Sequence, residues 1–149
     1  MISLCATVFN EVESIGSWID GLMAQTRPPD EIVICDAGSD DGTIEILQQA
    51  SDRHGVRFEV LPGANISAGR NAAIALAQGD IIAVTDAGTI AEPDWLENLV
   101  APLEADPDLA VSAGFYRPAG RNFFERVLAA VITPRRSDLE PHGFPPSSR

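Results

Sequence analysis

Two aspartates, Asp36 and Asp86, each stand at the downstream end of a short apolar run. These runs, residues 31–35 and 81–85, are continuously hydrophobic, as parallel strands buried on both faces usually are. Ligands of open α/β sheets bind just beyond the carboxyl ends of the strands, so two acids in equivalent places predict a binding edge. The alternative is a structural role, because Asp-Ala-Gly also forms tight turns and caps helices.

The loop after the first run, Asp36–Thr43, combines two glycines with three aspartates. Gly38 and Gly42 permit tight turns, and the helix that follows offers free N–H groups and a positive dipole end. The glycines do not have the GxGxxG spacing, which argues against a nicotinamide-dependent oxidoreductase. A carboxylate at a strand end suits hydrogen bonds from a base or a ribose. The acids just before the helix, Asp41 above all, could instead simply cap it.

A further candidate is Arg70, in the small-residue helix AGRNAAIALA of residues 68–77. Small neighbours leave its guanidinium accessible, and an arginine fork suits a phosphate or a carboxylate, although a plain surface arginine is the alternative. Asp86 is followed by Ala87, Gly88 and Thr89. One carboxylate there could bind a ribose hydroxyl or a divalent cation, but hard cations usually take more oxygen ligands.

The composition limits the class of partner. The chain has 149 residues, enough for one domain with a hydrophobic core, and a net charge of −12. This excess of acid disfavours nucleic-acid binding, which needs Lys and Arg to neutralise phosphates. All ten basic residues are arginines. The lack of lysine excludes a P-loop lysine and Schiff-base chemistry.

Cys5 and Cys35 fall inside predicted core strands, where buried thiols acting as small hydrophobes are favoured over a disulfide or a metal pair. Met1 leads directly into an apolar strand without a basic segment, so no secretory signal is predicted. No apolar stretch approaches the roughly 18 residues that a membrane span needs. The expected compartment is the cytoplasm.

Strand patterns alternate with helical patterns along the chain. The order predicts a mostly parallel sheet with helices on both faces, in which the first strand lies between the second and the fourth and the third lies outside the second. Asn10 with Glu13 is expected to cap the first helix, and Ser67 the third. The predicted strands are 2–9, 31–35, 57–61, 81–85 and 109–115, and the helices follow residues 10, 39, 67, 93 and 122.

Four ordered motifs resemble the N-terminal part of a family 2 glycosyltransferase of the GT-A fold: ATVFNE at 6–11, IVICDAGSDDGT at 32–43, SAGRNAAIALAQGDIIAVTDAG at 67–88 and PDWLENL at 93–99. The resemblance covers roughly residues 2–116. It implies a Rossmann-like, three-layer α/β/α sandwich and an inverting transfer of a sugar from a UDP-, GDP- or dTDP-linked donor. The implied acceptor is a sugar or a lipid-linked sugar, which allows a location at the inner face of the membrane. A donor-binding fragment or a homologue without turnover is the alternative, and the oligomeric state is left open.

The resemblance also implies roles for individual residues. The base contact falls on Asp36, the helix arginine on Arg70, and the ribose contact and metal ligand on Asp86. The other implied nucleotide-sugar contacts are Thr7, Phe9, Asn10, Glu11, Gly38 and Ser39.

Two departures from the family pattern qualify these expectations. The second acid of the family's Asp-x-Asp is replaced by Gly88, so the expected dependence on Mg²⁺ or Mn²⁺ is weak. The family's catalytic base lies in the acceptor half, and no residue between 117 and 149 matches it. We therefore expect a nucleotide-sugar-binding α/β domain at 1–133. Residues 134–149 are expected to form a proline-rich arm or a truncated acceptor-side loop.

Overall fold

The computed structural model describes residues 1–114 and Val127 of the chain. The chain divides into two compact units, residues 1–101 and residues 102–149. Strands and helices alternate through the described part, as predicted. Their order is β1 (Ile2–Val8), α1 (Ile15–Met23), β2 (Glu31–Asp36), α2 (Thr43–His54), β3 (Arg57–Val60), α3 (Ile66–Leu76), β4 (Ile81–Val84) and α4 (Trp95–Ala105).

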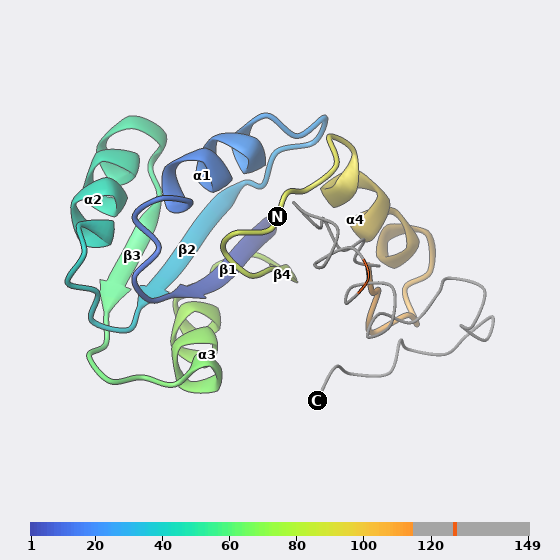
Figure 1. Ribbon diagram of the computed structural model, residues 1–149. Helices are drawn as coiled ribbons and strands as arrows, with labels where there is room; N and C mark the ends of the chain where they lie inside the picture. Colours follow the sequence, from blue (N-terminus) through green and yellow to red (C-terminus); the bar gives the residue numbers. More distant parts are fainter. Residues whose placement is uncertain (115–126, 128–149) are drawn as a thin grey trace. The chain divides into compact units, whose positions relative to one another are not determined.

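The first unit contains a parallel sheet with the strand order β3-β2-β1-β4 (Figure 1). β1 pairs with β2 on one side, where Val8 lies opposite Asp36, and with β4 on the other, where Cys5 lies opposite Val84. β3 pairs with the outer side of β2. The predicted order is confirmed. Because the strands run in the same direction, their carboxyl ends meet at one edge of the sheet.

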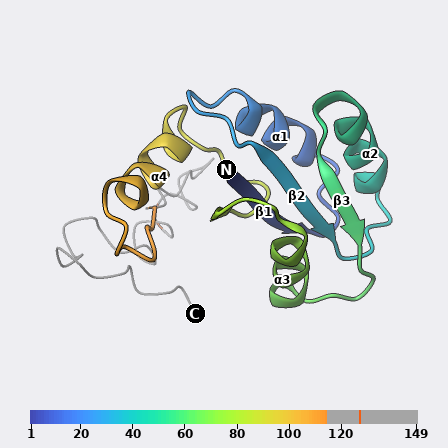
Figure 2. The ribbon, with the colours of Figure 1, turned by 180° about the vertical axis from the view of Figure 1, so that it is seen from behind.

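Helices cover both faces of this sheet, α1 and α2 on one face and α3 on the other (Figures 1 and 2). α1 buries a stripe at helical spacing, as predicted, against the alternate residues of β1 and β2 that point to its side. α3 packs Ala73 against the strand residues that point to the other face of the sheet, Cys5, Val33 and Cys35. The buried stripe of α1 consists of Ile15, Trp18, Ile19 and Leu22.

Both cysteines are buried and free. Burial, and secondly the charge of Glu31, raise the pKa of Cys5 to about 11. A thiol with so high a pKa is not a thiolate at neutral pH, and it behaves here as a small core residue. The prediction for the two cysteines is therefore confirmed.

The Glu31 carboxylate joins several segments at the amino end of the strands. It accepts hydrogen bonds from the Ser3 hydroxyl, from the Gln78 N–H and from Arg57 Nη1, the last at 2.8 Å. Burial alone would raise the pKa of Glu31, but these hydrogen bonds and the charge of Arg57 together lower it. The network ties β1, β2, β3 and the loop before β4 together at the end of the sheet opposite Asp36.

The predicted helix caps are wrong. α1 begins at Ile15, after Ser14, and Asn10 has a φ of 54°, with its side chain bonded to the next loop instead. α2 begins at Thr43 rather than directly after residue 39. In α3 the cap is Asn65, whose side chain accepts from the Ala68 N–H. For α1 a tertiary contact of Asn10, and for α3 a neighbouring side chain, displaced the local pattern.

The last predicted elements are only partly covered by the described residues. Residues 109–114 do not form a strand, and Leu109 and Val111 are 38% and 56% exposed. These residues pair with no strand in the described part of the chain, and an apolar pattern alone does not make a strand. The predicted helix 122–132 and the boundary at 133 lie outside the described residues. Within the described part, no helix is long and apolar enough to span a bilayer.

Candidate functional site

Asp36 and Asp86 both lie at the carboxyl edge of the sheet. Asp36 is the last residue of β2, and Asp86 follows the end of β4 by two residues. Since β2 and β4 are both parallel to β1, the two acids share this edge. The sequence-based prediction of a common edge is confirmed.

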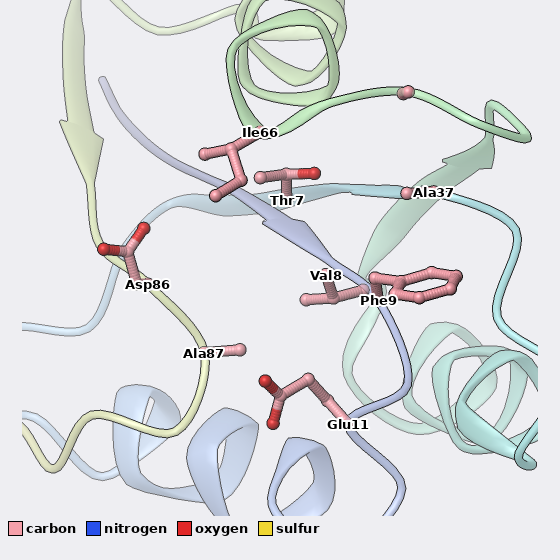
Figure 3. Close-up of a pocket in the computed structure, with 9 residues that line it drawn as sticks. Thr7, Val8, Phe9, Glu11, Ala37, Ile66, Asp86 and Ala87 are labelled. Atoms are coloured by element: carbon pink, nitrogen blue, oxygen red, sulfur yellow. The ribbon is translucent and has the colours of Figure 1, made fainter.

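A cavity of about 270 Å³ opens at this edge (Figure 3). The Glu11 carboxylate points toward Ala87, and Asp86 lies on the same loop as Ala87 (Figure 3). Apolar side chains form most of the lining, and two carboxylates supply its charge. A mostly apolar hollow with a few polar groups is the usual form of a small-molecule site. The lining residues are Thr7, Val8, Phe9, Glu11, Ala37, Ala64, Ile66, Asp86 and Ala87.

Asp36 does not line this cavity; it is fully buried and organises its own loop. Its Oδ1 accepts from the N–H groups of Gly38 (2.8 Å) and Ser39 (2.7 Å), and its Oδ2 from the Ser39 hydroxyl (2.6 Å). The turn requires Gly38, whose φ is 95° and whose added Cβ would lie 3.1 Å from Pro62 Cα. The neighbour Ala37 is thereby held in the cavity wall.

Hydrogen bonds fasten the loop after β1 to the loop after β2. Asn10 donates its N–H to Ser39 Oγ (2.8 Å), and its Oδ1 accepts from the Asp40 N–H (3.1 Å). The Glu11 N–H donates to Thr43 Oγ1 (2.8 Å). These bonds fix the backbone that carries Phe9 and Glu11. Asn10 and Ser39 thus hold the cavity wall in place from behind.

Asp41 also takes part in the hydrogen bonds that join these two loops. Its Oδ1 accepts from the N–H and the hydroxyl of Thr43, and its Oδ2 from the Val12 N–H at 3.0 Å. The Thr43 hydroxyl is the main cause of a lowered pKa for Asp41. Asp41 is not the N-cap of α2, which is Gly42. Its carboxylate instead holds the turn before the helix and binds the loop after β1.

Arg70 and Asp86 form an ion pair beside the cavity. Arg70 Nη2 donates to Asp86 Oδ1 at 2.6 Å, and the two side chains are 34% and 60% exposed. Arg70 Nε is buried, and it has no hydrogen-bond partner among the described residues. The guanidinium fork is therefore only partly satisfied by Asp86.

The two carboxylates of the cavity suit a divalent cation whose other ligands come from a bound anion. Its lining contains the carboxylates of Glu11 and Asp86 and no basic residue. A Cβ at Gly88 would lie 3.9 Å from Glu11 Oε2, so Glu11 lies beside the loop that carries Asp86. In the described part of the chain, no three acidic, His or Cys side chains are grouped closely enough to hold a metal alone. Mg²⁺ often takes one or two carboxylates and completes its shell with phosphates and water.

The predicted site residues either line the cavity, pair with a lining residue or shape the loops behind the cavity. Thr7, Phe9, Glu11 and Asp86 line the cavity, and Arg70 pairs with Asp86. Asn10, Asp36, Gly38 and Ser39 shape the loops behind it. The lining residues that the sequence analysis missed are Val8, Ala37, Ala64, Ile66 and Ala87. These carry no chemical signal, but they lie at or just after strand ends, in the loop before α3 or at its first residue, and the parallel topology brings these segments to this edge.

Comparison with known proteins gives a family match over nearly all of the chain. The model of Glycosyl transferase family 2 matches residues 3–146. A glucosyl-dolichyl phosphate glucuronosyltransferase of Haloferax volcanii is 31% identical over 122 residues, covering 78% of this chain and 38% of that protein. A cholesterol galactosyltransferase of Borreliella burgdorferi is 28% identical over 116 residues, covering 77% and 32%. The chain thus spans about a third of the length of these relatives.

Solved structures give the same fold. A mannosyltransferase from Pyrobaculum calidifontis, in complex with GDP-Man and Mn²⁺, has a TM-score of 0.63 at 27% identity, covering 72% of this chain and 33% of that one. A glucosyl-3-phosphoglycerate synthase from Mycobacterium tuberculosis, with Mn²⁺, UDP and glucosyl-3-phosphoglycerate, has a TM-score of 0.52 at 27% identity, covering 69% and 39%. The predicted Rossmann-like GT-A fold is confirmed.

Proposed function

We propose that this chain, which belongs to glycosyl transferase family 2, binds a nucleotide-diphosphate sugar at the carboxyl edge of its sheet for inverting transfer to an acceptor hydroxyl. The observation that carries the proposal is the cavity in which Thr7, Phe9, Glu11 and Asp86 meet. Two solved relatives that share the fold were crystallised with a nucleotide or nucleotide sugar and Mn²⁺, which supports a donor of this class.

The roles we propose follow from the chemistry of the lining. Phe9 and Ile66 are 57% and 66% exposed, and they offer apolar surface to the faces of a base. Asp86 can accept a hydrogen bond from a ribose hydroxyl. Arg70, which pairs with Asp86 beside the cavity, can bind a diphosphate oxygen. Asp36 acts indirectly in this scheme, by holding the loop that presents Ala37.

A divalent cation has a place in the same scheme. Glu11 and Asp86 would repel a diphosphate, and a cation between them would convert that repulsion into attraction. Asp86 would be its first protein ligand, with Glu11 beside position 88 as the nearest second acid. When bound, such a cation supplies positive charge that offsets the charge on the departing diphosphate.

We propose the acceptor only as a class, a sugar or a lipid-linked sugar. One relative is named for a glucosyl-dolichyl phosphate acceptor, which supports the second class. A lipid-linked acceptor would bring the reaction to the inner face of a membrane. Inverting transfer also needs a base that deprotonates the acceptor hydroxyl. The roles proposed for the described residues concern the donor alone.

A second candidate function is donor binding without turnover. Gly88 favours it, because this glycine removes an oxygen ligand from the position where the family places its second acid. The two functions differ in a single measurable property, the release of nucleoside diphosphate from a sugar donor.

Two measurements test the proposal. Calorimetric titration of the chain with UDP, GDP and dTDP, with NAD as the control, is expected to show saturable binding of at least one diphosphate and none of NAD. Incubation with the matching sugar donors and Mn²⁺ then measures release of the diphosphate by coupled assay. Binding with release supports the enzyme, and binding without release supports the second candidate. Binding of NAD alone would refute both.

A further inference from the structure

Arg70 is bonded to the carboxylate of Asp86, the residue that we propose as the first protein ligand of a divalent cation. Its Nη2 lies 2.6 Å from Asp86 Oδ1, which is the distance of a charge-assisted hydrogen bond. One carboxylate oxygen of Asp86 is thus already paired with a positive charge in the nucleotide-free protein. An arriving metal ion must compete with this guanidinium for the same oxygen.

We propose that Arg70 is the resident counter-ion of Asp86, and that a divalent cation binds Asp86 only after a nucleoside diphosphate has drawn the guanidinium away. The inference rests on the proposed function for the identity of the anion. The competition between Arg70 and the cation does not depend on it, because it exists before any nucleotide binds.

The exposure of the pair shows that it can open. The Arg70 and Asp86 side chains are 34% and 60% exposed, so water can solvate both charges when they separate. Ion pairs of this kind contribute little net stability and are screened by salt. A fully buried pair would instead resist opening, because each partner would leave an uncompensated charge behind. Arg70 is therefore able to move between two anions.

The unsatisfied part of Arg70 indicates where it would move. Its Nε is buried and has no hydrogen-bond partner in the described part of the chain, so Asp86 satisfies the guanidinium fork incompletely. A diphosphate offers several charged acceptor oxygens, and arginine binds phosphate groups with two parallel hydrogen bonds. A diphosphate in the neighbouring cavity can satisfy the fork better than the single oxygen of Asp86 does.

The exchange couples the two ligands. Once Arg70 has turned to the diphosphate, Asp86 regains a free negative charge, and the cavity holds Asp86, Glu11 and an anion with no cation among its lining residues. These are the conditions under which a hard cation binds. Because linkage is reciprocal, the cation must also raise the affinity for the diphosphate by the same factor.

The decisive experiment uses Mn²⁺ alone, without nucleotide. We compare Mn²⁺ affinity by calorimetry and by electron paramagnetic resonance for wild type, Arg70→Met and Arg70→Gln. Removal of the resident cation is expected to raise Mn²⁺ affinity roughly fivefold or more, the scale of a typical coupling. Arg53→Met, on the last turn of α2, is the matched control, since it changes the net charge equally. Added Asp86→Asn in the Arg70→Met background is expected to abolish the gain.

The outcomes separate this inference from the proposed function. Unchanged Mn²⁺ affinity in both folded Arg70 variants, or a gain that survives Asp86→Asn, would overturn it. An equal gain in Arg53→Met would reduce the effect to net charge and overturn it too. A second titration adds UDP or GDP, which is expected to raise Mn²⁺ affinity in wild type more than in Arg70→Met. Failure of any diphosphate to bind wild type would refute the proposed function, while the nucleotide-free result would still decide the competition.

Discussion

Gly69 of α3 packs directly against Thr7 of β1. A Cβ on residue 69 would overlap Thr7 Oγ1 and lie 3.0 Å from Thr7 Cβ. The absence of a side chain at residue 69 therefore sets how closely the first turn of α3 approaches the sheet. This turn carries Arg70 toward Asp86, and Thr7 lines the cavity, so the contact fixes two elements of the site at once.

We predict that Gly69→Ala destabilises the protein and weakens nucleotide binding. The added methyl must push α3 away from β1, and overpacking of this kind typically costs about 1–3 kcal/mol. Chemical denaturation and nucleotide titration measure the two effects. Gly21→Ala in α1 is the control, because nothing lies within 4 Å of its added Cβ. That substitution should be neutral or slightly stabilising in a helix. Equal stability of the two variants would show that α3 can shift at no cost.

A second prediction concerns the two loop carboxylates. Asp36→Ala is expected to weaken nucleoside diphosphate binding more than Asp41→Ala does. Asp36 holds the turn that places Ala37 in the cavity wall. Loss of the hydrogen bonds of this buried acid costs roughly 1–3 kcal/mol of the stability of that turn, and a displaced wall weakens nucleotide binding indirectly. Asp41 is bonded to Thr43 and Val12, behind the cavity. Calorimetric titration of both folded variants with UDP and GDP decides, and equal losses would contradict these roles.

The parallel sheet and its binding edge could be predicted from the sequence because they follow from continuous apolar runs and from topology. Asp36 and Asp86 had to share an edge once their strands ran in the same direction. Burial of Asp36 could not be predicted in this way. It depends on the N–H groups of Gly38 and Ser39 turning back toward the carboxylate, and a one-dimensional pattern does not specify that turn.

Local patterns also failed where a distant partner competed. Asn10 and Glu13 have the spacing of a capping box, but the Asn10 side chain accepts from Asp40, thirty positions away. The Arg70–Asp86 pair joins residues sixteen positions apart, and only the packing of α3 on β1 and β2, with β4 paired to β1, brings them together. Their residue types suggested binding roles, whereas their mutual contact required the fold.

A third prediction follows from the lowered pKa of Glu31. A carboxyl whose pKa is lower in the folded than in the unfolded state stabilises the fold above its unfolded pKa. That contribution is lost as the pH falls through the folded pKa. Glu31→Gln should therefore cost about 1 kcal/mol at pH 7 and progressively less in acid. Urea denaturation between pH 7 and pH 3 measures this. The exposed Glu13→Gln is the control, and a pH-independent difference for Glu31→Gln would exclude the ionic contribution.

The final prediction is that metal dependence is weak in wild type and is strengthened by Gly88→Asp. Gly88 has a φ of 79°, so any side chain there costs roughly 1–2 kcal/mol, and Asp and Asn tolerate this conformation best. The new carboxylate would also lie beside Glu11, whose Oε2 is 3.9 Å from the position of the added Cβ. Without a cation the two acids repel each other, and with a cation they become ligands together with Asp86.

Gly88→Asn separates the charge from the backbone strain, because it shares the strain and carries no carboxylate. Titration with UDP or GDP, with and without Mn²⁺, is expected to show a modest Mn²⁺ effect in wild type and Gly88→Asn and a clearly larger one in Gly88→Asp. Both variants should unfold at a lower temperature than wild type without ligand, and only Gly88→Asp should recover on addition of Mn²⁺ with nucleotide. Tight Mn²⁺ binding to nucleotide-free wild type would contradict the prediction, since Asp86 paired with Arg70 cannot supply such a site unaided.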